Sequence, residues 1–133
     1  MKIRPHSIQN FDRVRTKNGV RCVMLNHYFL TYWQNMAVYI VSRLTIHNRA
    51  EYDKYDDQFD EVFAKFNGKV LSVDEEPIVL AGEWEATRSV IIEFPSKEAA
   101  FTWMKSDDYQ RISKHRNAGS TLSSILVKSL EMD

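Results

Sequence analysis

The pattern of hydrophobic and polar positions changes at about residue 36. Before it, no helical or strand period is sustained. After it, stretches with a period of two alternate with stretches whose period is close to 3.6, which predicts alternating strands and helices. Residues 37–46 are the first predicted strand. One face of this strand carries Val38, Ile40 and Leu44, and the other carries Tyr39, Val41, Arg43 and Thr45.

A helix is predicted directly after this strand. Asn48 is suited to cap it, because Glu51 three residues later completes a capping box. Asn67 and Gly68 are typical of a helix end. The helix would bury a wide aromatic stripe made of Tyr52, Tyr55, Phe59, Val62, Phe63 and Phe66.

The same patterns predict three more strands and two more helices. Pro95 ends the third strand, Ser96 caps the second helix and Asp107 caps a third, short helix. The predicted strands are residues 69–73, continued by 77–82 past an acidic bend, then 89–94 and 124–130, and the helices are residues 96–105 and 107–117.

This order predicts an α+β fold, the ferredoxin-like βαββαβ arrangement of a four-stranded antiparallel sheet with two main helices on one face. Two helices cover only one face of such a sheet. The other face would expose Val41, Ile91 and either Ile125 or Leu126, depending on the register of the last strand. Because an uncovered apolar face is unfavourable by about 25 cal/mol per Å², we expect two copies to pair through it as a homodimer.

The charge of the chain divides at the same place as the pattern. Eighteen basic and 18 acidic residues give a net charge of zero, but residues 1–35 hold six basic residues and one acid, a charge of +5. Residues 36–133 hold 12 basic and 17 acidic residues, a charge of −5. We therefore divide the chain into a basic N-terminal extension, residues 1–35, and a domain, residues 36–133. The extension could be an arm that docks on the domain, a targeting presequence, or the product of a mis-assigned start that precedes Met36.

Composition excludes several classes of protein. Hydrophobic residues make up 44% of the chain, as in globular proteins. The single cysteine, Cys22, excludes an intrachain disulfide framework, and the apolar stretch 20–33 is too short and too interrupted to span a membrane. An acidic domain is not expected to bind nucleic acid or a membrane surface. Cytoplasm is the default location.

One segment of the domain resembles a known family. Glu83-Trp84 with Arg88, followed by VIIEFPSKEAAFTWMKSDDYQ at 90–110, is similar to the family called domain of unknown function 1330. The resemblance extends over about residues 36–130 and is most specific at IEFPS and Tyr109. Asp108, where the family more often has Glu, and the extension depart from it. The resemblance implies a dimeric α+β barrel, in which two ferredoxin-like sheets face each other, and it implies no established activity.

No motif for a cofactor or a metal is present, so no cofactor is expected. The helix after Asn48 carries an acidic ridge that is interpreted as solvated, made of Asp53, Asp56, Asp57, Asp60 and Glu61. The four histidines lack paired metal-ligand spacing and are interpreted as surface or cap residues: His6, His27, His47 and His115. A catalytic acid–base pair of His47 with Glu93 is the weak candidate for chemistry, inferred from the ends of strands.

A cluster of polar groups among aromatic residues is the better candidate for a site. An arginine in a cleft between sheet and helix, or at the dimer seam, could hold a carboxylate while tyrosine hydroxyls orient it. The alternative is structural: Arg88 pairs with Glu83 or Glu85, and the aromatic residues are packing. The ligand-binding candidates are Tyr39, Tyr52, Tyr55, Trp84, Arg88, Tyr109 and Arg116.

Two functions are therefore consistent with the sequence. The first is a small-molecule binder or cofactor-free enzyme with a pocket in each protomer, by analogy with other proteins of the fold. The second is a dimeric interaction module without a ligand pocket. A ligand-sized cavity bordered by Arg88 or Arg116 would favour the first, and a fully packed layer between helices and sheet would favour the second.

Overall fold

The computed structural model describes residues 36–130. The N-terminal extension, with Cys22, His6 and His27, lies outside the described residues. The elements follow the order β1 (Val38–Ile46), α3 (Arg49–Phe63), β2 (Lys69–Asp74), β3 (Arg88–Phe94), α4 (Lys97–Met104), α5 (Asp107–Gly119) and β4 (Ser120–Lys128).

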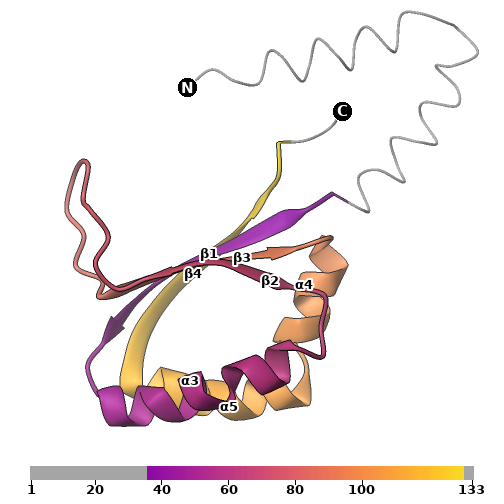
Figure 1. Ribbon diagram of the computed structural model, residues 1–133, viewed down its shortest axis with the longest axis horizontal. Helices are drawn as coiled ribbons and strands as arrows, with labels where there is room; N and C mark the ends of the chain where they lie inside the picture. The colour runs from indigo at the N-terminus through magenta and orange to yellow at the C-terminus, as the bar shows by residue number, and fades with distance from the viewer. Residues whose placement is uncertain (1–35, 131–133) are drawn as a thin grey trace, which may run out of the picture.

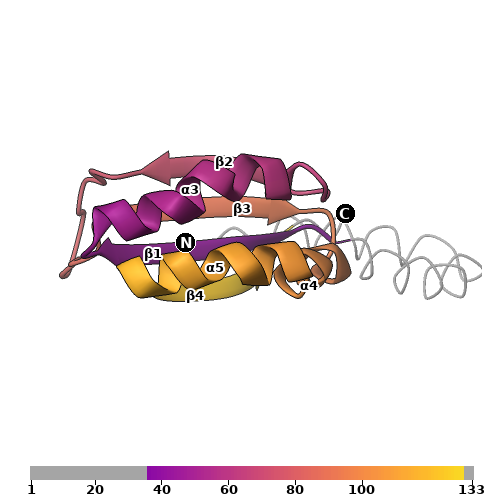
Figure 2. The same cartoon turned by 90° about the horizontal axis from the view of Figure 1, so that it is seen from below.

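The four strands form one antiparallel sheet in the order β2-β3-β1-β4. Helices α3 and α5 lie side by side across one face of it, and within residues 36–130 no helix lies over the other face (Figures 1 and 2). Ile40 lies opposite Ile92 on one neighbouring strand and Leu126 on the other, so these three side chains share the helix-facing side. The predicted α+β, ferredoxin-like arrangement is confirmed.

The open face has the composition that the strand pattern predicted. Val41 lies opposite Ile91 and Ile125, so the register assigns Ile125, and not Leu126, to this face. Val41, Ile125 and Val127 are exposed there. Closure of a barrel with a second copy remains a prediction.

Each described helix begins at a capping side chain. The Oδ1 of Asn48 accepts a hydrogen bond from the Glu51 amide at 3.1 Å, which confirms that cap. Ser96 accepts from the Ala99 amide at 3.1 Å to start α4. For α5 the cap is Ser106, which accepts from the Tyr109 amide at 3.2 Å, whereas Asp107 was predicted. Asp107 instead occupies the first turn, where its charge complements the helix dipole.

The third helix is longer than expected. Residues 107–117 were predicted as a short helix, but α5 has 13 residues, whereas α4 has only 8. Helix α5 packs along α3 (Figure 2). The last residue of α5, Gly119, lies very close to the first turn of α3. The Gly119 carbonyl accepts hydrogen bonds from the amides of His47 and Asn48, both at 3.0 Å.

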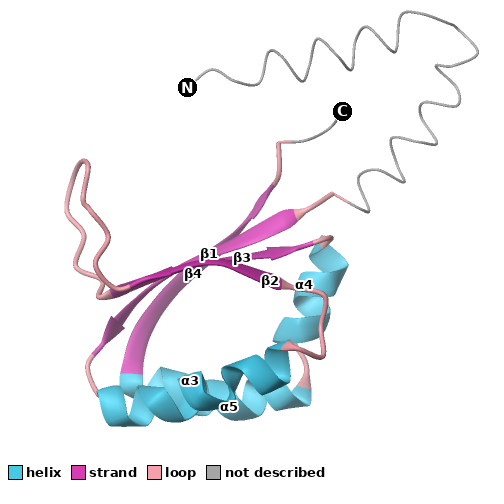
Figure 3. Cartoon of the chain, in the orientation of Figure 1, coloured by secondary structure: helices cyan, strands magenta, loops and turns pink. Residues whose placement is uncertain are grey.

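Two predicted strands differ from the observed ones. Strand β4 begins at Ser120, four residues before the predicted start, because it leaves α5 directly and pairs with the end of β1 from Ile46 onward. Residues 77–82 were predicted to continue β2 but lie in a loop, residues 75–87 (Figure 3). Asp74 pairs with Ser89 almost at the start of β3, so beyond it β2 has no partner strand.

Between sheet and helices lies an aromatic core. Tyr52, Phe94 and Ile112 are its largest fully buried side chains. The structure gives most residues of the IEFPS segment a role in the fold. Ile92 and Phe94 are buried in the core, Pro95 follows the end of β3, and Ser96 caps α4. No helix within residues 36–130 is long and apolar enough to cross a membrane.

Candidate functional site

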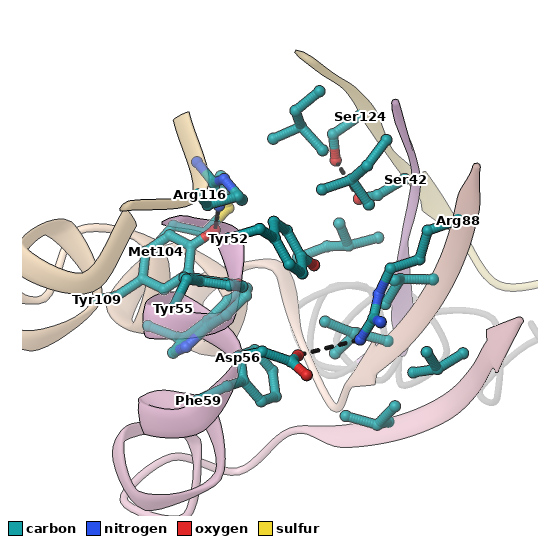
Figure 4. A pocket seen from close by; sticks show the side chains of 18 of the residues that line it. Ser42, Tyr52, Tyr55, Asp56, Phe59, Arg88, Met104, Tyr109, Arg116 and Ser124 are labelled. Atoms are coloured by element: carbon teal, nitrogen blue, oxygen red, sulfur yellow. Dashed lines mark hydrogen bonds and ion pairs between the residues drawn. The ribbon is translucent and has the colours of Figure 1, made fainter. Parts of the chain in front are cut away.

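The layer between the helices and the sheet contains a cavity of about 460 Å³ (Figure 4). Every strand and every helix of the described chain contributes to its lining. Its walls are mostly apolar, as is usual for sites that bind small molecules, with charged and hydroxyl-bearing side chains among them. The polar and aromatic lining residues are Ser42, Tyr52, Tyr55, Asp56, Phe59, Asp60, Arg88, Trp103, Tyr109, Gln110, Arg116 and Ser124.

Arg88 is held at one side of the cavity by two carboxylates. It lies opposite Leu44 at the start of β3, on the helix-facing side, and its side chain is only 11% exposed. Its guanidinium donates to Oδ1 of Asp56 at 3.0 Å and to Oε2 of Glu75 at 2.5 Å. Neither Glu83 nor Glu85, the partners considered from the sequence, is involved. The positive charge of Arg88 is therefore neutralised within the protein.

Glu75 joins Arg88 to the start of helix α3. It also accepts from Arg49, at 3.1 Å to Oε1 and 3.4 Å to Oε2. The hydrogen bonds from Arg49, and after them those from Arg88, hold the pKa of Glu75 below its usual range despite partial desolvation. The same contact with Glu75 raises the pKa of Arg49. This carboxylate is therefore ionised at neutral pH and fixes the base of the 75–87 loop.

Arg116 has a different environment. Its guanidinium lies against the rings of Tyr55 and Tyr109, 5.4 Å from each centroid, and donates from Nη1 to the Tyr109 hydroxyl oxygen. Its Nε and Nη2 donate to Oδ1 of Asn117 at 3.2 and 3.1 Å. Within residues 36–130 it makes no ion pair with a carboxylate. Arg116 is thus a cavity-lining cation whose charge no carboxylate of the described chain neutralises.

The hydroxyl of Tyr109 is set up to donate. A guanidinium only donates hydrogen bonds, so the Tyr109 oxygen accepts from Arg116 and its own proton is left for another acceptor. Burial raises the pKa of Tyr55, and burial likewise raises the pKa of Tyr52 against the opposing charge of Arg88. These two phenols are therefore neutral hydrogen-bond donors over the physiological pH range.

Two buried nitrogens on cavity-lining residues have no hydrogen-bond partner. They are Nε of Arg88 and the indole Nε1 of Trp103, a residue that is 2% exposed. Unpartnered buried donors are uncommon and need an explanation. On the sheet, Ser42 and Ser124 face each other across β1 and β4 and share a hydrogen bond of 2.8 Å (Figure 4). The cavity is thus apolar with local polar groups on opposite sides.

The structure brings five of the seven ligand-binding candidates together. Tyr52, Tyr55, Arg88, Tyr109 and Arg116 all line the cavity. Tyr39 does not, because it lies opposite Glu93 on the open face. Trp84 does not either, since it belongs to the 75–87 loop, where the Arg43 guanidinium lies 5.4 Å from its ring.

The proposed acid–base pair of His47 and Glu93 is not formed. Glu93 lies opposite Tyr39 near the beginning of β1, and His47 follows the last residue of the same nine-residue strand. At about 3.3 Å per residue the two are separated by nearly the length of β1.

The interpretations of the acidic ridge as wholly solvated and of His115 as a surface or cap residue also change. Asp56 and Asp60 border the cavity and Asp56 binds Arg88, so the ridge is not wholly a solvated surface. His115 bonds Glu51 through Nδ1 at 2.7 Å, linking α5 to α3, and this bond holds the pKa of Glu51 below its usual range. Across residues 36–130 no group of three or more His, Cys, Asp or Glu side chains is arranged to hold a metal ion.

Sequence reasoning missed several residues of the site. Ser42 and Ser124 come from two strands, Trp103 from α4 and Asp56 from the ridge. One signal was present: Ser42 occupies a helix-facing position between Ile40 and Leu44, where the period predicts an apolar residue. A polar residue at a core position of a strand indicates a site.

Comparison with known proteins identifies the family. The model of the family described as "Domain of unknown function (DUF1330)" matches residues 37–130. The chain belongs to the DUF1330 family. This confirms the resemblance found at 83–110 and its extent. Among proteins with curated functions, none matches the sequence.

Solved structures agree with the fold. A protein of unknown function from Rhodopseudomonas palustris has a TM-score of 0.65 at 19% identity, over 81% of this chain and 93% of that one. A dimeric protein of unknown function with a ferredoxin-like fold, from Bacteroides fragilis, has a TM-score of 0.52 at 11% identity, over 74% and 100%. SnoaB, a cofactor-independent oxygenase from Streptomyces nogalater, has a TM-score of 0.50 at 18% identity, over 71% and 93%. At these identities the likeness concerns the fold alone.

Proposed function

We propose that this DUF1330 protein is a homodimer that binds a small carboxylate-containing molecule in the helix–sheet cavity of each protomer. The observation on which the proposal depends is Arg116, a cavity-lining cation without a carboxylate partner in the described chain. A half-buried charge is stabilised by a counterion, and since no carboxylate of residues 36–130 supplies one, a ligand carboxylate is the counterion that we propose.

Arg116 replaces Arg88 as the anchor that we favour for the carboxylate. The sequence offered both arginines, but Arg88 already binds Asp56 and Glu75, so a third carboxylate there would be repelled. Beside Arg116 the Tyr109 hydroxyl has a proton to donate. Together they can offer a carboxylate charge-assisted hydrogen bonds, which are worth about 1.5–3 kcal/mol each.

The rest of the cavity supports a ligand with an apolar body. A volume of about 460 Å³ falls within the about 300–1,000 Å³ of sites for small molecules. Ile40, Ile92 and Leu122 line it from the sheet, opposite the tyrosines. The unpartnered Trp103 and Arg88 nitrogens support a ligand, or a water held with it, that presents further acceptor oxygens.

The alternative, a dimeric module without a ligand pocket, is less well supported because the helix–sheet layer is not fully packed. The Bacteroides neighbour is described as dimeric, which supports self-association. Oxygenase activity is a property of the Streptomyces neighbour, and we assign no reaction to this chain.

Binding can be tested with benzoate as the probe and benzamide as its neutral counterpart. We expect benzoate, at millimolar concentration, to shift the amide resonances of cavity residues, and benzamide to bind at least about tenfold more weakly. Arg116→Gln should weaken benzoate binding by about tenfold or more, because it removes the charge-assisted contacts.

Arg111→Gln is the matched control, since Arg111 is an exposed arginine on the same helix that does not line the cavity. It should leave the benzoate affinity unchanged. Equal binding of benzoate and benzamide, or an Arg116→Gln protein that binds benzoate as the wild type does, would exclude Arg116 as a carboxylate anchor.

A further inference from the structure

The loop between β2 and β3, residues 75–87, projects from the sheet on the side away from the helices (Figure 1). We call it the hairpin arm. Its base is fixed: Glu75 binds Arg49 and Arg88, and Thr87 donates its amide to the Leu44 carbonyl at 2.8 Å. No regular secondary structure is present in it, and its outer part projects beyond the open sheet face.

The outer part of the arm is apolar and exposed. Ile78 is 85% exposed and Leu80 is 93% exposed, and Val79 and Trp84 are exposed as well. A consecutive Ile-Val-Leu run on a protein surface is unfavourable unless another surface covers it. Gly82, with a φ of 75°, turns the chain back at the end of this run.

The arm's charge restricts what can cover it. Glu75, Glu76, Glu83 and Glu85 flank the apolar run, and the arm contains no Lys or Arg. Anionic lipid surfaces and nucleic acids attract basic segments and repel acidic ones. The occupant is therefore a protein surface.

A second copy of this chain is the occupant that the geometry favours. The arm stands beside the open face, where Val41, Ile125 and Val127 are also exposed, so any copy that covers this face also meets the arm. Strands of 9, 6, 7 and 9 residues present only about half of their side chains there, fewer than the about 20 residues per partner of a stable interface. The arm supplies the missing contact area.

We infer that the hairpin arm is an intersubunit clamp: in the homodimer, Ile78, Val79 and Leu80 of each protomer pack on the other protomer. This inference rests on the homodimer of the proposed function but is independent of the ligand. By twofold symmetry each arm is used once, so one substitution alters two contacts.

Dimer affinity measured by sedimentation equilibrium tests the clamp. Ile78→Asp with Leu80→Asp should weaken dimerisation by about 30-fold or more, because apolar anchors dominate such interfaces. Ile125→Asp on the open face should also weaken it. Phe101→Asp is the matched control, because Phe101 is an exposed apolar residue on α4, away from the arm and the open face, and it should leave the affinity unchanged.

The outcomes separate the clamp from the dimer. An arm variant that dimerises like wild type while Ile125→Asp does not would overturn the clamp and leave the sheet-face dimer standing. A wild-type protein that is monomeric at 100 µM would overturn both the clamp and the sheet-face dimer. If deletion of residues 1–35 exposes the amides of the hairpin arm, the segment that covers the arm is residues 1–35 and not a second copy. Hydrogen exchange on the wild type is independent of any substitution: the amides of 78–82 should be protected at high protein concentration and exchange freely on dilution.

Discussion

At the scale of single residues, Gly119 is a position where neighbouring backbone atoms leave no room for a side chain. A Cβ there would lie 2.7 Å from the Tyr52 amide nitrogen and 2.8 Å from the Asn48 carbonyl oxygen, and both are backbone atoms that cannot rotate away. The close approach lets the Gly119 carbonyl accept from His47 and Asn48, and it places α5 beside α3.

We therefore predict that Gly119→Ala lowers the free energy of unfolding by about 2 kcal/mol, since the two helices must move apart. This corresponds to a fall in Tm on the order of 10 °C for a domain of this size, measured by calorimetry. Gly82→Ala is the comparison: no atom lies within 4 Å of the added Cβ, so only the φ of 75° strains the alanine, and the cost should be about 1 kcal/mol. Equal costs would show that steric contact at Gly119 is unimportant.

The residues of the site were only partly predictable. Arg88, Tyr52 and Tyr109 could be named because a charged or hydroxyl-bearing side chain at a core-facing position has to have a partner. Ser42 is likewise a hydroxyl-bearing residue at a core-facing position, but it was not among the predicted site residues. Which arginine is neutralised could not be inferred, because Asp56 and Glu75 reach Arg88 from 32 and 13 residues away in sequence. That choice depends on tertiary packing.

At the scale of elements, Glu75 connects three of them: α3 through Arg49, β3 through Arg88 and the hairpin arm to which it belongs. Its pKa is lowered in the folded state, so its contribution to stability is full above the unfolded pKa of about 4.3 and is lost as the pH falls through the folded pKa. Because the side chain is 42% exposed, solvent limits this contribution to about 1 kcal/mol.

Glu75→Gln should therefore reduce the unfolding free energy by about 0.5–1 kcal/mol at pH 7, and the difference from wild type should shrink steadily below about pH 4. Urea titrations at several pH values measure it. Glu76→Gln serves as the control, since Glu76 makes no ion pair within the described chain, and it should change little at any pH. A difference for Glu75→Gln that grows towards acid pH would contradict the assigned sign.

The elements themselves were largely predictable, with errors that have a common cause. The strand period assigned β1 and β3 and both faces of the sheet, and side-chain caps marked the start of α3 and α4. Residues 77–82 have the composition of a strand, but a strand needs a partner, and the pairing of Asp74 with Ser89 leaves none. Local pattern indicates what a segment can form, whereas pairing across the sheet decides what it does form.

At the scale of the whole molecule, the described elements make a complete layer structure from Met36 to Ser129. Met36 is buried, and the Ala37 carbonyl accepts a hydrogen bond from the Ser129 amide at 2.9 Å, so both ends of the domain are joined. The family match begins at the same place, at residue 37. The division of the chain at residue 36, with the −5 charge on its C-terminal side, remains a prediction that deletion can test.

A protein that starts at Met36 should therefore fold with a Tm within about 2 °C of the full chain, because the core cluster lies within residues 38–112. A loss of 1 kcal/mol would already lower the Tm of such a domain by about 4–8 °C. Deleting residues 1–40 is the matched control: it removes Val38 and Ile40, which are both buried in the core, and should abolish cooperative unfolding. If the chain from Met36 instead loses many degrees while its dimer affinity is unchanged, the extension packs on its own domain. If Tm and dimer affinity fall together, the extension takes part in the contact between protomers, and the area that we assign to the hairpin arm would have to be shared with it.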